Sequence, residues 1–224
     1  MNHDSRQLRT NLKRLTDTLV LSGELHAFIR YRAHQVDHLL PLSCENNQAH
    51  LAEFIVAYIE RVPDLLEALH SITLKAKLAS EFKDLLQVAN SYFDSPYDRV
   101  DRGYEMNTLI DQAYLVHKLL ESMNDHLFAK LGYRLLPLEL SFSNSVIYEL
   151  LGAEFTEDLD QAIQFVIEAL FSKSLAAEKC ASETLSQTQG CIDWDNFVLS
   201  WPQLEVQADA LLSTQDQSPL RVIH

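Results

Sequence analysis

Apolar residues recur every three or four positions through the first forty residues of the chain. This series also includes two polar residues. Its members are Leu8, Leu12, Leu15, Leu19, Ser22, His26, Ile29, Ala33, Val36 and Leu40. Steps of three and four residues match an α-helical period of about 3.6 residues, so these positions share one side of a helix. We therefore predict a helix over residues 5–40, with Asp4 or Ser5 as its N-cap and Pro41 as its stop.

Two polar residues, Ser22 and His26, interrupt this apolar stripe. We interpret them as a buried polar layer that fixes how neighbouring helices align, as buried polar residues do in coiled coils. The functional alternatives are a ligand pocket in the centre of a bundle and a pH-sensitive packing switch. Gly23 lies between the two residues, and a helix break there would move His26 to a helix end and weaken both alternatives.

The same spacing predicts two further helices. Over residues 48–92 the stripe consists of Leu51, Ile55, Tyr58, Val62, Leu65, Leu69, Ile72, Ala76, Ala79, Lys83 and Leu86. Pro63 has no backbone N–H to donate, and because the stripe keeps its phase across it, we expect a kink rather than a break. The third helix is predicted over residues 102–131, with Gly132 at its C-cap position.

The regular spacing weakens after Gly132, where shorter elements are expected. These are an extended segment over residues 134–140, a helix over 144–151 that ends at Gly152, a helix capped by Thr156, a linker over 181–190 and a final helix over 194–212.

Together these elements predict an all-α fold, an elongated antiparallel bundle of three long helices over residues 1–132. A smaller acidic helical part over residues 133–213 is expected to pack on the bundle within one continuous domain, followed by a mobile tail over residues 214–224. The chain has only 5 Gly and 6 Pro in 224 residues. That is few of the turn residues on which all-β and α/β folds depend.

The net charge of −14 bears on the partners of the protein. A surface this acidic is expected to repel DNA, RNA and anionic membranes. Arg6, Arg9 and Lys13 share one helical face, which we interpret as a solvated helix start rather than a nucleic-acid site. The chain begins with a polar segment, contains no long apolar run, and has three cysteines without a disulfide pattern. We therefore expect a cytoplasmic protein without membrane spans.

Two pairs, each of a glutamate and a histidine, have the spacing of metal ligands. Glu67 and His70 form a Glu-x-x-His pair, and His117 and Glu121 form a His-x-x-x-Glu pair on the next predicted helix. Ferritin-like di-metal bundles need such pairs to converge from several helices. We favour ordinary surface positions for Glu67 and His70, and leave a divalent metal site as an alternative.

The third helix also carries several polar residues away from its apolar stripe. They are Asp111, His117, Glu121, Asn124, Asp125 and His126. We interpret them as the solvated face of an amphipathic helix. The chain has no nucleophile motif and no glycine-rich phosphate loop, so no catalytic set and no cofactor are predicted.

The last predicted helix carries Trp194, Phe197 and Trp201 after the linker. Aromatic residues on such a helix suit docking to a partner or to a second copy of the chain, or filling the protein's own core. The favoured function is a non-enzymatic protein acting through protein–protein contacts, as a regulator, adaptor or chaperone-like binder that forms homo-oligomers. The alternatives are the carboxylate–histidine metal bundle and a helical small-molecule-binding regulator.

Overall fold

The computed structural model describes residues 2–36, 45–75, 83, 86–87, 89, 106–132, 134, 136 and 138–172. This part of the chain is all-helical, as predicted, and contains no strand. Its helices are α1 (Asn2–Leu21), α2 (Glu24–Val36), α3 (Glu45–Glu60), α4 (Val62–Lys75), α6 (Met106–Leu131), α7 (Ser141–Leu151) and α8 (Ala153–Ser172). None of them is both long enough and apolar enough to cross a membrane.

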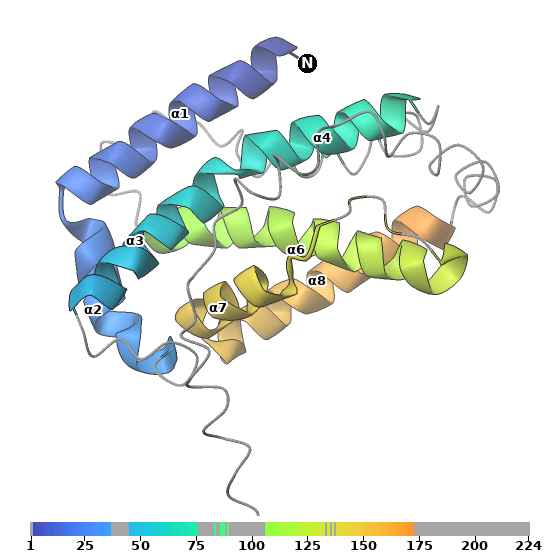
Figure 1. The fold of residues 1–224 in the computed structure, drawn as a ribbon. Helices are drawn as coiled ribbons and strands as arrows, with labels where there is room; N and C mark the ends of the chain where they lie inside the picture. Colours follow the sequence, from blue (N-terminus) through green and yellow to red (C-terminus); the bar gives the residue numbers. More distant parts are fainter. Residues whose placement is uncertain are drawn as a thin grey trace, which may run out of the picture.

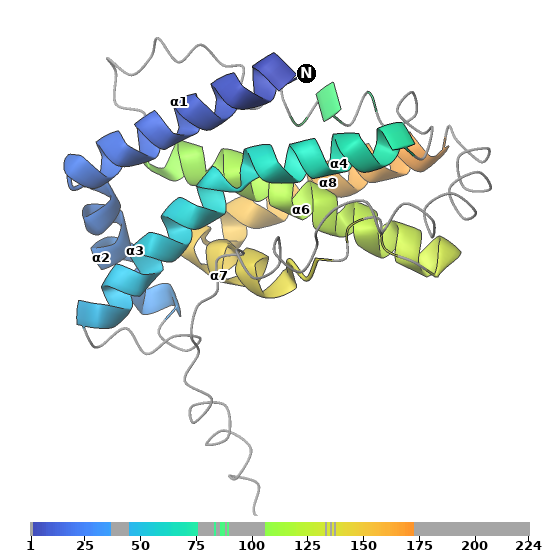
Figure 2. The ribbon, with the colours of Figure 1, turned by 45° about the horizontal axis from the view of Figure 1, so that its top comes forward.

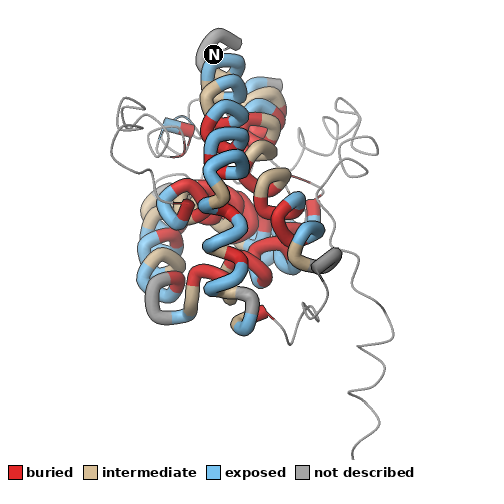
Figure 3. The backbone as a smooth tube through the Cα atoms, turned by 90° about the vertical axis from the view of Figure 1, so that its left-hand side faces the viewer, coloured by how far each residue is buried: buried red, intermediate tan, exposed pale blue. Residues whose placement is uncertain are grey.

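Helix α6 lies at the centre of the fold (Figure 1). It contacts α8 and α7 on one side and α3 and α4 on the other. Helix α1 lies against α3 and α4, away from α7 and α8 (Figures 1 and 2). Helix α2 runs across one end of this arrangement and contacts α1, α3, α6 and α7. Figure 3, which views the fold from the α2 end, shows buried positions alternating with exposed ones along the helices.

The first predicted helix is divided into α1 and α2 at Gly23. Gly23 has φ 79°, a left-handed conformation that glycine adopts without steric cost. Its N–H bonds the carbonyl of Val20 at 3.1 Å, which closes the end of α1. The hydroxyl of Ser22 then accepts a hydrogen bond from the N–H of Glu24 at 3.4 Å and caps the start of α2.

The predicted buried layer of Ser22 and His26 is therefore wrong, because both residues are exposed. Of the predicted stripe on α2, Ile29 and Val36 are buried, but Leu25 takes the buried position that was predicted for His26. The buried polar residue of α1 is Thr16, whose hydroxyl donates to the Glu60 carboxylate of α3 at 2.7 Å.

The kink predicted at Pro63 corresponds to the junction of α3 and α4, which Arg61 alone separates. Backbone hydrogen bonds continue on both sides of it, from the Arg61 N–H to Ala57 at 3.0 Å and from the Leu65 N–H to Arg61 at 3.1 Å. The chain bends here without a loop (Figure 1), because Pro63 removes a single N–H from the ladder.

Two predicted helix ends are confirmed and one helix start is wrong. Gly132 (φ 77°) closes α6 and Gly152 (φ 95°) closes α7, each through an N–H bond of 2.9 Å to the carbonyl four residues earlier. Thr156 is not an N-cap, because α8 already begins at Ala153. The Thr156 side chain is buried and donates back to the Gly152 carbonyl at 3.0 Å.

One hydrophobic cluster includes residues from both predicted parts of the chain. Leu136, Val146, Ile147, Leu150 and Ile163 are buried in it together with residues of α1 to α4 and α6. Among positions 134, 136 and 138–140, where an extended segment was predicted, no strand forms. Asn124 of α6 holds this segment by two hydrogen bonds to the backbone of Leu136, of 2.8 and 2.9 Å.

Several sequence predictions fall outside the described residues. They are the stop at Pro41, the linker over residues 181–190, the final helix over 194–212 with Trp194, Phe197 and Trp201, and the tail over 214–224.

Candidate functional site

His117 lies in the core, although its position on α6 predicted a solvated face. Its side chain is fully buried and stacks on the ring of Tyr58 from α3, with 3.8 Å between ring centroids and 22° between planes. Its Nε2 lies 3.0 Å from the backbone carbonyl of Tyr58. Because a carbonyl only accepts, Nε2 carries the proton. Burial lowers the pKa of His117 to about 3, so the ring is neutral near pH 7.

Asn144 of α7 connects this ring pair to a buried carboxylate. Its Oδ1 accepts a hydrogen bond from the Tyr58 hydroxyl at 2.7 Å, and its Nδ2 donates to Glu121 at 3.0 Å. Lys118 also donates to Glu121, at 2.8 Å. Burial raises the pKa of Glu121, but hydrogen bonds, that from Lys118 foremost, outweigh burial and lower it below its ordinary value.

These hydrogen bonds join α3, α6 and α7 through their side chains. His117, Glu121 and Asn124 are buried because α7, α8 and the segment at Leu136 cover the face of α6 that the sequence predicted to be solvated. Since Tyr58, Asn144, Lys118 and Glu121 bond one another and join three helices, we interpret the network as a structural connection rather than a reactive site.

The metal hypothesis required Glu67, His70, His117 and Glu121 to converge. Glu67 is exposed on α4, where its carboxylate pairs with Arg9 of α1 at 3.4 Å. His117 and Glu121 lie instead in the polar network described above. In the described part of the chain, no group of three or more His, Cys, Asp or Glu side chains is placed to hold a metal ion, so these four residues form none.

Arg9 also pairs with Asp64 of α4. The basic face predicted on the first helix is thus partly neutralised by two carboxylates of α4. This arrangement agrees with its interpretation as an ordinary helix surface.

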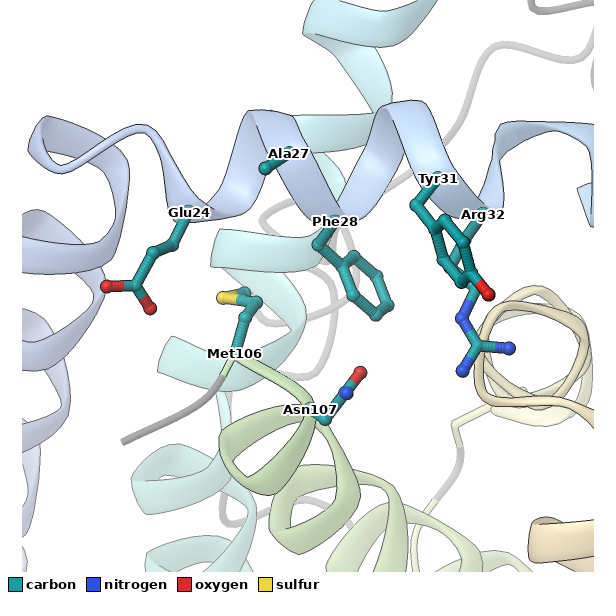
Figure 4. Close-up of a pocket in the computed structure, with 7 residues that line it drawn as sticks. All are labelled: Glu24, Ala27, Phe28, Tyr31, Arg32, Met106 and Asn107. Carbon is teal, nitrogen blue, oxygen red and sulfur yellow. The ribbon is translucent and has the colours of Figure 1, made fainter. Parts of the chain in front are cut away.

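An open groove lies between α2 and the first turn of α6 (Figure 4). Its volume is about 270 Å³, and the residues lining it are Glu24, Ala27, Phe28, Tyr31, Arg32, Met106 and Asn107. Phe28 is half-buried and Met106 is buried, so they form an apolar floor. Tyr31 is 73% exposed at the edge, a high value for an aromatic side chain.

The two ends of the groove carry opposite charges. Glu24 lies at one end and Arg32 at the other, with Phe28 between them (Figure 4). Glu24 and Arg32 are eight positions apart along α2, which corresponds to about 12 Å along the helix axis.

Arg32 is held in place by its neighbours. Its guanidinium lies 5.5 Å from the centre of the Tyr31 ring. The side-chain amide of Gln35 is oriented so that its nitrogen donates to the backbone carbonyls of Glu149 (3.0 Å) and Leu150 (3.2 Å). In this orientation the side-chain oxygen of Gln35 accepts a hydrogen bond from Arg32 at 3.1 Å. The C-terminal end of α7 therefore orients the cation of the groove.

Comparison with protein-family models, with curated proteins and with solved structures finds no match to this chain. Any assignment of function therefore depends on the geometry of the site.

Sequence reasoning missed this groove. Phe28, Tyr31 and Arg32 have the spacing of one helical face, but this face lies beside the predicted stripe. It becomes a groove only because the turn at Gly23 brings α2 against the first residues of α6. The only local signal in the sequence was an aromatic pair, Phe28 and Tyr31, followed directly by Arg32 in the helix that begins after Gly23.

Asp111 lies one helical turn after Asn107, near the groove, in surroundings that disfavour its ionised carboxylate. Its Oδ1 is buried without a hydrogen-bond partner among the described residues. Burial raises the pKa of Asp111 to about 6, although the charge of Arg32 lowers it.

The variant Asp111→Asn is therefore expected to be more stable than the wild type by about 1 kcal/mol at neutral pH, a value reduced for partial exposure. The folded pKa of about 6 lies above the ordinary 3.8, so the cost of ionisation is fully present above pH 6 and disappears by pH 3.8. Urea unfolding of both proteins across this range measures the difference. A gain that persists below pH 3.8 would contradict this explanation.

Proposed function

We propose that this protein is a non-enzymatic helical module, a regulator or adaptor, that binds segments of other proteins in the groove between α2 and α6. The observation that carries the proposal is the exposed Tyr31 beside an apolar floor of Phe28 and Met106, framed by charges of opposite sign. Exposed aromatic residues beside a concave apolar surface are typical of binding hot spots.

The size of the groove favours a side chain over a complete small molecule. Its volume of about 270 Å³ lies below the range of roughly 300–1,000 Å³ that is usual for small-molecule sites. It is also open to solvent. One large side chain from a partner would fill it, with the rest of the partner lying across the edge.

The net charge of the chain and the structural role of its buried polar network support the same proposal. A net charge of −14 steers the protein away from nucleic acids and anionic membranes and toward partners with basic residues. The buried network at His117 and Glu121 links helices, and its polar groups bond one another. A regulator or adaptor in the cytoplasm is the role that we propose.

Tyr31→Ala is expected to weaken binding of peptides selected on the immobilised protein from a random peptide library. The expected loss is about tenfold or more, because truncation of an aromatic hot spot costs about 1–2 kcal/mol or more. Phe165→Ala is the matched control, since Phe165 is also 73% exposed but lies on α8 and does not line the groove. Selected peptides that bind Tyr31→Ala and the wild type equally would contradict the proposal.

A further inference from the structure

We propose that the segment bound in this groove is an amphipathic helix with a basic, a large apolar and an acidic residue at positions i, i+4 and i+8. This inference rests on the function proposed above and commits it to one chemical class of partner.

The spacing follows from the row of side chains that α2 presents. Glu24, Phe28 and Arg32 are themselves four residues apart, so they form one ridge along the helix. A partner helix that lies along this ridge repeats its side chains at the same interval. Its basic residue then meets Glu24, its apolar residue reaches the floor at Phe28, and its acidic residue meets Arg32.

The two charges of the groove are available for such a partner. Glu24 is exposed in the first turn of α2 and forms no ion pair with a described residue. Arg32 forms none either, and the contacts with Tyr31 and Gln35 fix its guanidinium at the other end.

The floor of the groove accepts one large apolar side chain. Phe28 and Met106 lie opposite each other across the groove (Figure 4). Methionine adapts its shape to different neighbours, so phenylalanine, leucine and methionine on the partner all suit the site.

A helix fits this site better than an added β-strand. Strand addition needs the edge of a sheet, and the described part of the chain contains no strand. A groove between two helices is the usual receptor for an amphipathic helix with anchors at helical spacing.

The test uses two helical peptides with the full-length protein at low ionic strength. One carries Lys, Phe and Glu at i, i+4 and i+8, and the other has Glu in place of Lys. We expect fluorescence anisotropy to show that the wild type prefers the Lys peptide by about threefold to tenfold, as exposed ion pairs allow. Glu24→Lys, a change at an exposed position, should reverse this preference.

Equal affinity of the two peptides for both proteins would overturn the inference, as would failure of both to bind while library-selected peptides still bind through Tyr31. In either case the proposed function stands, because the Tyr31→Ala and Phe165→Ala comparison tests it separately. Dimers in light scattering that dissociate in Tyr31→Ala would also overturn it, since a second copy of the chain would then occupy the groove.

Discussion

Asn144→Ala is expected to lower the free energy of unfolding by about 3 kcal/mol or more. The substitution removes the acceptor of the Tyr58 hydroxyl and a donor to Glu121 in one step. Tyr58 is fully buried and Glu121 is 8% exposed, so water cannot replace either bond without rearrangement. Each buried polar group that loses its partner costs about 1–3 kcal/mol, and a charged group costs more.

Urea unfolding of Asn144→Ala beside Ser145→Ala measures this effect. Ser145 is exposed on the same helix, and its hydroxyl donates to the backbone carbonyl of Ser141 at 2.8 Å. Ser145→Ala is expected to change stability by less than about 0.5 kcal/mol. Equal losses in the two variants would show that the network at Asn144 does not join α3, α6 and α7.

Acid is expected to destabilise the protein through His117. The folded pKa of about 3 lies below the ordinary value of 6.5, so the unfolded chain binds a proton that the folded chain excludes. Stability from this residue is complete above pH 6.5 and is lost as the pH falls toward 3. The loss is about 1.4 kcal/mol per pH unit, or nearly 3 kcal/mol two units below 6.5.

The variant His117→Gln isolates this contribution. Glutamine keeps a donor that can reach the Tyr58 carbonyl but does not titrate. The difference in unfolding free energy between wild type and variant should therefore shrink as the pH falls below 6.5, because only the wild type loses this term. His26→Gln removes an exposed histidine and is the control. A difference that is constant over this range would contradict the buried, neutral state of His117.

The pH dependences of His117 and Asp111 have opposite signs. Protonation of Asp111 below about pH 6 stabilises the fold, whereas the exclusion of a proton from His117 destabilises it in acid. The His117 term is the larger, because its ring is fully buried and Asp111 is only half-buried.

The helices, and those helix ends that depend on a single local residue, could be predicted from the sequence. Gly132 and Gly152 follow apolar stripes and end α6 and α7, because a left-handed residue closes a helix regardless of its surroundings. Gly23 has the same conformation, but the stripe runs through it in phase, so periodicity alone predicted one long helix. The turn there became visible only with the backbone in place.

The buried network and the groove could not be predicted from the sequence, because burial of α6 is decided by elements distant in sequence. His117, Glu121 and Asn124 have the spacing of a wet helical face. They are buried because α7, α8 and the segment at Leu136 cover this face. Their hydrogen-bond partners come from α3, α7 and the backbone of Leu136. No local sequence pattern predicts such hydrogen-bond partners. The groove similarly needs α2 and α6 together, which are some seventy residues apart along the chain.

Photo-crosslinking of a library-selected peptide most directly tests whether the α2–α6 groove is a binding site. A photoreactive phenylalanine derivative is placed at position 31 or at position 165, which are equally exposed in the wild type. Crosslinking at position 31, and little at 165, is the result that a peptide-binding groove predicts. Equal crosslinking at the two positions, or crosslinking at 165 alone, would contradict it.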